Sequence, residues 1–290
     1  MTGNDPSVLT DLSGLGGVLA FYGTLFLVGS ALLMVWGWHF YHRPSAWRTK
    51  GRRLLWRPWS LVDVTQLVLI LLVLHLVVFA ALQIALRIGW LHDDGDVQHA
   101  WLVGHSLALH WAALVVIALC ASRRGISWQV GFTHPGWSWR QGLSWGALVY
   151  VATIPVLLTY AALYSVWLQW TGYEPRHQDV VALFASLEGG WLYYYLILLA
   201  VVVAPISEEL LFRGIALPAL GRRIGLGAAV VLHSILFALM HYHVPSLVPL
   251  FVLSIMLSLA YIYTENIIVP IVAHMIFNAV SLMVLTALNQ

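Results

Sequence analysis

The chain has 290 residues, of which 61% are hydrophobic and only 9% are charged, and its mean hydropathy is +0.84. An ordinary soluble domain carries about 25% charged residues, so the composition excludes that class and indicates a membrane protein. The formal net charge of +2 decides little, because the distribution of charge matters more than its sum. Cys120 is the only cysteine, which excludes an intrachain disulfide and a CxxC metal site.

Long apolar runs recur along the whole sequence. A helix needs roughly 18 to 20 apolar residues to cross a bilayer core of about 30 Å. The runs predict an all-α fold, a polytopic transmembrane bundle of about eight helices. Their predicted ranges are 16–38, 61–90, 101–120, 143–170, 191–212, 225–243, 247–263 and 267–288.

Basic residues gather in three loops, which the positive-inside rule places in the cytoplasm. They are Arg43, Arg48, Lys50, Arg52, Arg53 and Arg57, then Arg123, Arg124 and Arg140, then Arg213, Arg222 and Arg223. Acidic residues are expected on the opposite side, namely Asp5, Asp11, Asp93, Asp94 and Asp96. Both termini should face outward. The first apolar run lacks a basic segment before it and is long enough to span, so we expect no cleavable signal peptide.

The first basic loop, residues 39–60, is also rich in Trp. Such a loop could bind nucleic acid, but anchoring to anionic lipid of the bilayer is the favoured interpretation, so we expect no nucleic-acid partner. The expected location is the cytoplasmic (inner) membrane of the cell.

Glu208, Glu209 and Arg213 lie at the end of an apolar run. An ionised side chain near the bilayer centre costs about 2.5 to 3.5 kcal/mol on insertion scales, so such residues usually pair or line a polar cavity. Glu209 and Arg213 are four residues apart and share a helix face, whereas Glu208 points elsewhere. The spacing therefore predicts one structural glutamate, Glu209, and one free carboxylate, Glu208.

Two further polar pairs interrupt the apolar segments that follow, Phe237 with His241 and His274 with Asn278. Glu208 and His241 lie nearly equal numbers of residues before and after Ile224, the tip between two antiparallel segments. His274 lies roughly 13 Å from the next cytoplasmic turn at 1.5 Å per residue. The three side chains are thus predicted to meet at one depth in the cytoplasmic half of the membrane.

Pro205 and Pro270 each precede one of these polar groups. A proline lacks a backbone donor, so it frees a carbonyl and bends or breaks a helix. Broken helices in a membrane usually line a cavity.

The combination of EExxxR (Glu208, Glu209, Arg213), FxxxH (Phe237, His241) and HxxxN (His274, Asn278) resembles the CPBP intramembrane proteases. That family includes the CAAX prenyl endopeptidases and the bacterial Abi proteins. The resemblance covers roughly residues 200 to 280 and implies peptide hydrolysis within the membrane, often of prenylated or other membrane-embedded substrates. It divides the chain into subfamily-specific helices in residues 1–190 and a catalytic core in residues 191–290.

The residues allow a glutamate-type mechanism. Glu208 would act as the general base on a water, His241 and His274 would orient that water or carry protons, and Asn278 would bind the oxyanion. Glu209, Arg213 and Phe237 would support them.

A metal site is the competing chemistry, with Glu208, His241 and His274 as ligands of an ion such as zinc. The sequence contains no HExxH motif, and we expect no cofactor.

Other polar residues have structural interpretations. His75, His105, His110 and His233 are expected to form interhelical hydrogen bonds, His243 to lie at the interface, and Ser207 to cap the helix after Pro205.

Two other classes of protein stay open. A proton-coupled transporter would also keep ionisable residues inside a bundle, although it usually shows an internal repeat, which this sequence lacks. A non-catalytic scaffold or immunity protein of the same fold would share every motif. The sequence identifies neither the substrate, whether prenylated or not, nor the oligomeric state.

Overall fold

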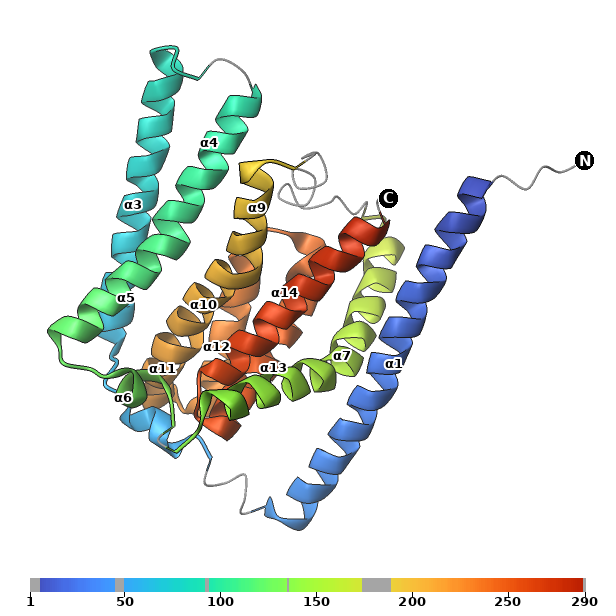
Figure 1. The fold of residues 1–290 in the computed structure, drawn as a ribbon. Helices are drawn as coiled ribbons and strands as arrows, with labels where there is room; N and C mark the ends of the chain where they lie inside the picture. Colours follow the sequence, from blue (N-terminus) through green and yellow to red (C-terminus); the bar gives the residue numbers. More distant parts are fainter. Residues whose placement is uncertain (1–5, 45–49, 92–93, 135, 174–188, 289–290) are drawn as a thin grey trace, which may run out of the picture.

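A computed structural model of the chain describes residues 6–44, 50–91, 94–134, 136–173 and 189–288, with the side chains of residues 6–15, 94, 96, 98 and 288 left out. All regular structure in these ranges is helical (Figure 1). The α-helices are α1 (Pro6–His42), α3 (Leu61–Arg87), α4 (Asp94–Ser106), α5 (Ala112–Arg123), α6 (Trp128–Phe132), α7 (Trp139–Trp170), α9 (Trp191–Leu198), α10 (Ala204–Glu209), α11 (Leu217–Ile224), α12 (Leu226–Leu239), α13 (Leu247–Thr264) and α14 (Ile268–Leu288).

Five short segments of other helical types connect these helices. Two are 3₁₀-helices, η1 (Arg52–Trp56) and η5 (Val244–Ser246). Three are π-helical, η2 (Leu107–Trp111), η3 (Leu199–Val203) and η4 (Leu210–Ala216). The π-helical segments continue the neighbouring α-helices, so α4, η2 and α5 form one run and α9 to α11 form another.

Seven helical runs of the described residues are long and apolar enough to cross a membrane, which confirms a multi-pass all-α protein. The eighth predicted span, residues 225–243, is wrong in length, because α12 has only 14 residues and rises about 21 Å. The helix ends in a turn where Tyr242 has a left-handed φ of 48°. Pro245 then lies in the 3₁₀-helix η5, which begins at Val244.

The run that carries the glutamates is longer than predicted. It extends from Trp191 to Ile224 rather than ending at Phe212. Arg213, which was predicted to lie in a cytoplasmic loop, therefore lies inside the helix with no exposed surface, and that placement is corrected. The apolar run ends at Phe212 in the sequence only because Arg213 carries a charge.

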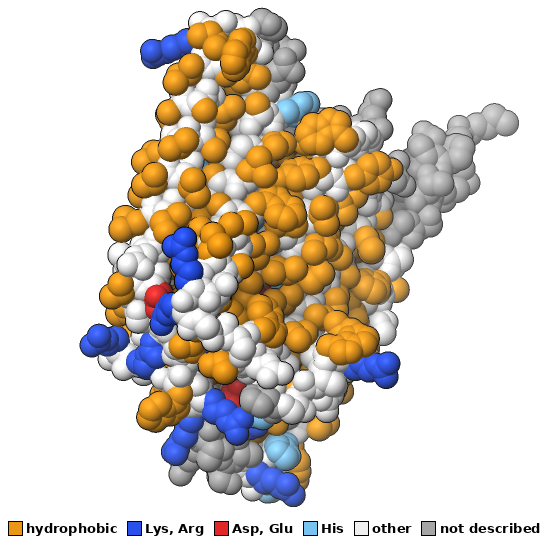
Figure 2. Space-filling view, turned by 60° about the vertical axis from the view of Figure 1, so that its left-hand side comes forward, with side chains coloured by type: hydrophobic (Ala, Val, Ile, Leu, Met, Phe, Trp, Pro, Cys, Tyr) orange, Lys and Arg blue, Asp and Glu red, His pale blue; other side chains and the backbone are white. Residues whose placement is uncertain are grey.

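The three basic loops lie at one end of the bundle and contact one another. The buried Arg57 donates to the carbonyls of Val130 (2.6 Å) and Glu265 (2.9 Å), and Arg222 donates to the carbonyl of Arg57 (2.6 Å). Figure 2 shows an apolar flank with Lys and Arg concentrated toward one end. The predicted clustering of positive charge is confirmed for these loops.

Other parts of the predicted charge distribution cannot be compared with the structure. Asp5, Arg48 and Asp93 lie outside the described residues, as do the side chains of Asp11, Asp94 and Asp96. The N-terminal end of α1 and the C-terminal end of α14 lie at the same end of the bundle, opposite the basic loops (Figure 1).

Close packing of α7 on α14 sets the position of His274. Gly142 and Gly146 form a GxxxG pair on α7, a spacing that lets membrane helices approach closely. A Cβ added at Gly146 would lie 2.6 Å from Val272 and 3.0 Å from the carbonyl of Val269 on α14. These glycines were not recognised from the sequence, although their spacing is visible there.

We expect Gly146→Leu to lower the melting temperature in detergent, because overpacking a close contact costs about 1 to 3 kcal/mol. Gly23→Leu is the matched control, because a Cβ at Gly23 on α1 meets no atom within 4 Å. Equal melting temperatures for the two variants would contradict the close approach of α7 and α14.

Candidate active site

A fully buried ion pair forms the centre of the polar cluster. Arg213 Nη1 donates to Glu209 Oε1 at 2.9 Å, and neither side chain has any exposed surface, so the predicted pair is present. The other guanidinium nitrogens bind α13: Nη2 donates to Ser254 Oγ at 2.8 Å, and Nε lies 3.4 Å from Ser258 Oγ. The ion pair therefore joins η4 to α13.

Two residues of α12 extend this network. Ser254 Oγ donates to Ser234 Oγ at 2.9 Å, and Ser258 Oγ lies 2.9 Å from His233 Nε2. The expected interhelical role of His233 is confirmed. Buried hydroxyl groups thus meet the donors of Arg213 on one side while Glu209 neutralises its charge on the other.

His274 connects the two glutamates. Its Nδ1 lies 2.9 Å from Glu209 Oε1, and its Nε2 lies 4.0 Å from Glu208 Oε2. A carboxylate oxygen accepts, so Nδ1 carries the proton in this contact. When the ring is neutral, Nε2 has a lone pair directed toward Glu208. The sequence had paired Glu209 with Arg213 alone, and the structure adds His274 as a second donor to the same oxygen.

Glu208 differs from Glu209 in its surroundings. Its side chain is 19% exposed, whereas that of Glu209 is fully buried. No hydrogen bond to its carboxylate is present among the described residues. The predicted division into one paired and one free glutamate therefore agrees with the contacts.

Phe237 is the aromatic centre of the cluster. The Arg213 guanidinium lies over its ring at 4.7 Å, and the rings of His241 and His274 lie 4.9 and 6.0 Å away. These contacts keep the charged and titratable groups against an apolar surface. They also explain why Phe237 and His241 are four residues apart: Nδ1 of His241 is bonded to the carbonyl of Phe237 at 2.8 Å.

His241 lies in the turn after α12, half-buried, and not inside a spanning helix as predicted. Because Nδ1 donates to a carbonyl, Nε2 of the neutral ring is left as an acceptor. Its ring lies 4.9 Å from that of Phe237, which places His241 at the edge of the same cluster.

Asn278 compensates for the proline in the glutamate helix. In the π-helical segment η3, the amide of Ala204 donates to the carbonyl of Leu199, five residues back. The next donor in this pattern would be residue 205, which is a proline and has no N–H. Asn278 Nδ2 donates to the carbonyl of Ala200 instead, at 2.8 Å. The predicted freed carbonyl thus exists, and one amide hydrogen of Asn278 stays available.

We expect Asn278→Ala to destabilise the fold by about 1 to 3 kcal/mol, because the Ala200 carbonyl loses its donor. If Asn278 also binds an oxyanion, the cleavage rate should fall by about 10² to 10³. Pro205→Ala in the same chain restores a backbone donor to Ala200. Recovery of the melting temperature without recovery of activity separates the two roles, and recovery of both would reject the oxyanion role.

One residue beside the cluster was not recognised from the sequence. His110 Nδ1 lies 2.8 Å from Ser207 Oγ, next to Glu208. The interhelical hydrogen bond expected of His110 is confirmed, but its position beside Glu208 was missed, because the sequence places it about 100 residues away. Ser207 is not a helix cap: it lies inside the run and its hydroxyl donates to the carbonyl of Ala204 at 2.9 Å.

The other histidines have local partners. His75 and His105 contact each other through their Nδ1 atoms at 3.2 Å, which confirms an interhelical role. His243 lies 2.7 Å from Ser246 Oγ in the turn between α12 and α13.

The residues do not fit a three-ligand metal site as they stand. Within the described ranges, no group of three His, Cys, Asp or Glu side chains is arranged to hold an ion. Of the three candidate ligands, Glu208 and His274 are close, but His241 does not complete a set with them.

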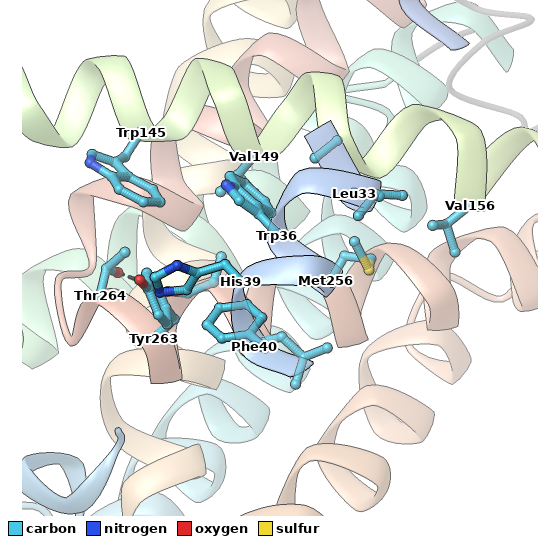
Figure 3. Close-up of a pocket in the computed structure, with 14 residues that line it drawn as sticks. Leu33, Trp36, His39, Phe40, Trp145, Val149, Val156, Met256, Tyr263 and Thr264 are labelled. Carbon is cyan, nitrogen blue, oxygen red and sulfur yellow. Dashed lines mark hydrogen bonds between the residues drawn. The ribbon is translucent and has the colours of Figure 1, made fainter. Parts of the chain in front are cut away.

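An apolar pocket lies apart from this cluster. It has a volume of about 420 Å³ and lies between α1, α7 and α13, where Trp36, Phe40, Trp145 and Tyr263 line it (Figure 3). The residues of α13 that line it lie on the face opposite Ser254 and Ser258. Any ligand in this pocket is therefore separated from Arg213 by the thickness of α13.

The helical runs and the buried polar cluster define a multi-pass membrane protein with a candidate active site inside the bundle. Residues 189–280 match the family model described as type II CAAX prenyl endopeptidase Rce1-like. The match covers less than half of the chain, includes all three motifs, and confirms the resemblance to the CAAX protease family. No curated protein and no solved structure matches the chain.

Proposed function

We propose that the protein is an intramembrane endopeptidase that cleaves a membrane-associated or lipid-modified substrate in the cytoplasmic membrane. The observation that carries the proposal is the pair formed by Glu208 Oε2 and His274 Nε2, 4.0 Å apart. This distance is too long for a direct hydrogen bond and lets one water bind both atoms. The family match at residues 189–280 supports the same class of reaction.

In the proposed reaction, Glu208 takes a proton from the bound water while the water oxygen attacks the carbonyl carbon of the substrate. The tetrahedral oxyanion receives a hydrogen bond from the second amide hydrogen of Asn278. The C–N bond then breaks, and the proton taken from the water is delivered to the leaving nitrogen. His274 orients the water through Nε2, because Glu209 holds the proton on its Nδ1.

The short α12 supports access of water to this site. A helix that rises about 21 Å does not cross a core of about 30 Å, so the turn at His241 lies within the membrane thickness. Non-helical backbone at that depth is tolerated where protein buries it or where it lines a water-filled cavity. From the depth that the sequence predicts for Glu208, in the cytoplasmic half of the membrane, we propose that the cavity opens toward the cytoplasmic end, where the basic loops lie.

No step of this reaction uses a metal ion. Activity that survives exhaustive chelation, with no ion found by elemental analysis, is the expected result. Loss of activity that an added metal restores would reject the metal-free mechanism.

The test of the function is comparative membrane proteomics of cells that carry the wild type or Glu208→Gln. In cells that carry the variant, uncut substrates whose cleavage site lies in the membrane or beside it should accumulate. A reporter ending in a prenylated CAAX sequence then tests whether the substrate class of the matched family applies. Identical peptide profiles at equal expression would reject the protease.

A further inference from the structure

A π-helical segment from the N-terminal half packs against the helix that carries the glutamates. Segment η2 interrupts the run from α4 to α5 and contacts α10. π-Helical turns weaken the regular hydrogen bonding of a helix and are frequent at functional sites. Segment η2 lies outside the residues that match the CAAX protease family, and it carries His110.

The hydrogen bonds around Ser207 fix which nitrogen of His110 carries the proton. A hydroxyl has a single hydrogen, and that of Ser207 is donated to the carbonyl of Ala204 at 2.9 Å. Its contact with His110 Nδ1 at 2.8 Å is therefore one in which His110 donates. In the neutral ring, Nε2 then has a lone pair, and it has no hydrogen-bond partner within the described part of the chain.

His110 lies beside the glutamates. Ser207, to which its Nδ1 is bonded, is the residue directly before Glu208, and segment η2 contacts α10. Glu208, His241 and His105 are the titratable groups whose charges act on His110.

We propose that His110 is a further proton-accepting residue of this site, acting at Nε2. The inference rests on the proposed endopeptidase function. The proton that Glu208 takes from water passes to Nε2, which gives an imidazolium whose Nδ1 hydrogen stays on Ser207. As the C–N bond breaks, Nε2 returns this proton to the leaving nitrogen. Glu208 is ionised again, and the proton count is balanced.

The test uses His110→Asn in the full-length protein. The amide nitrogen of Asn can occupy the position of Nδ1 and donate to Ser207, but Asn has no second ring nitrogen. We expect the same melting temperature, a fall of about 10² or more in kcat on a reporter that the wild type cleaves, and loss of one limb of the pH–rate profile. His134→Asn is the matched control, because His134 lies 2.8 Å from Arg53 at the basic end of the bundle, and it should keep the wild-type rate and profile.

A wild-type rate and pH profile in His110→Asn would overturn the inference while leaving the endopeptidase in place, provided that Glu208→Gln is inactive. If Glu208→Gln is active, both proposals fall together. Should His110→Asn not fold, nitrogen-15 spectra of the histidine-labelled wild type decide. A neutral His110 with its proton on Nδ1 supports the inference, and a proton on Nε2 overturns it.

Discussion

Replacing Glu208 with Gln should reduce the cleavage rate by about 10² to 10⁴, the usual contribution of a general base. Gln has nearly the same shape but cannot take a proton from water. Since Glu208 makes no hydrogen bond in the described chain and is partly exposed, the fold should not depend on its charge. The measurement is the single-turnover rate of reporter cleavage by purified protein in liposomes, together with the melting temperature and expression level.

Glu265→Gln is a matched control for this substitution. Glu265 is also mostly buried, but it lies at the basic end of the bundle and pairs with Arg53 at 3.8 Å. We expect it to keep the wild-type rate. Full activity in Glu208→Gln would reject the general-base role, and an equal loss in both variants would point to a general effect of charge instead of chemistry.

Glu209→Gln should mainly lower the stability of the fold. Removing one partner of a buried ion pair leaves an uncompensated charge, which costs about 3 to 5 kcal/mol. Arg213 keeps its bonds to Ser254 and Ser258, but these hydroxyl groups cannot neutralise it. We expect a lower detergent melting temperature, less protein in the membrane, and loss of activity through His274.

The double variant Glu209→Gln, Arg213→Met separates charge from contact. Met fills part of the volume of Arg and removes the unpaired charge, so the melting temperature should rise above that of Glu209→Gln alone. A melting temperature unchanged by Glu209→Gln would contradict the assignment of this pair as the structural centre.

Much of the site could be predicted from spacing and polarity. Charge inside an apolar run is costly enough to be conspicuous, so Glu208, Glu209 and Arg213 stood out. The four-residue spacing gave the ion pair. Equal distances from a loop tip placed Glu208 level with His241, and the distance from the next cytoplasmic turn placed His274 at the same depth. The partners of Arg213 on α13 could not be predicted, because serine is common in membrane helices and carries no comparable signal.

The errors have related physical causes. Basic residues were assigned to loops. Arg222 does lie at the basic end of the bundle, in the last turn of α11, but Arg213 is buried inside the helix, since a charge count does not reveal a buried partner. The length of α12 was overestimated, because the apolar run continues past the residue at which the backbone turns. The link between His110 and Ser207 depends on tertiary packing of segments far apart in the chain, for which one sequence gives no periodicity.

The two adjacent glutamates also affect how this kind of protein can diverge. Glu209 holds Arg213 and His274 through one oxygen, whereas Glu208 contributes no bond to the packing of the helices. A single mutation at position 208 would thus leave a folded protein that still binds its proposed substrate in the bilayer but does not cleave it. The same change at position 209 would instead lower the stability of the fold and the amount of protein in the membrane. Inactive descendants of such a chain should accordingly have lost the first carboxylate and retained the second.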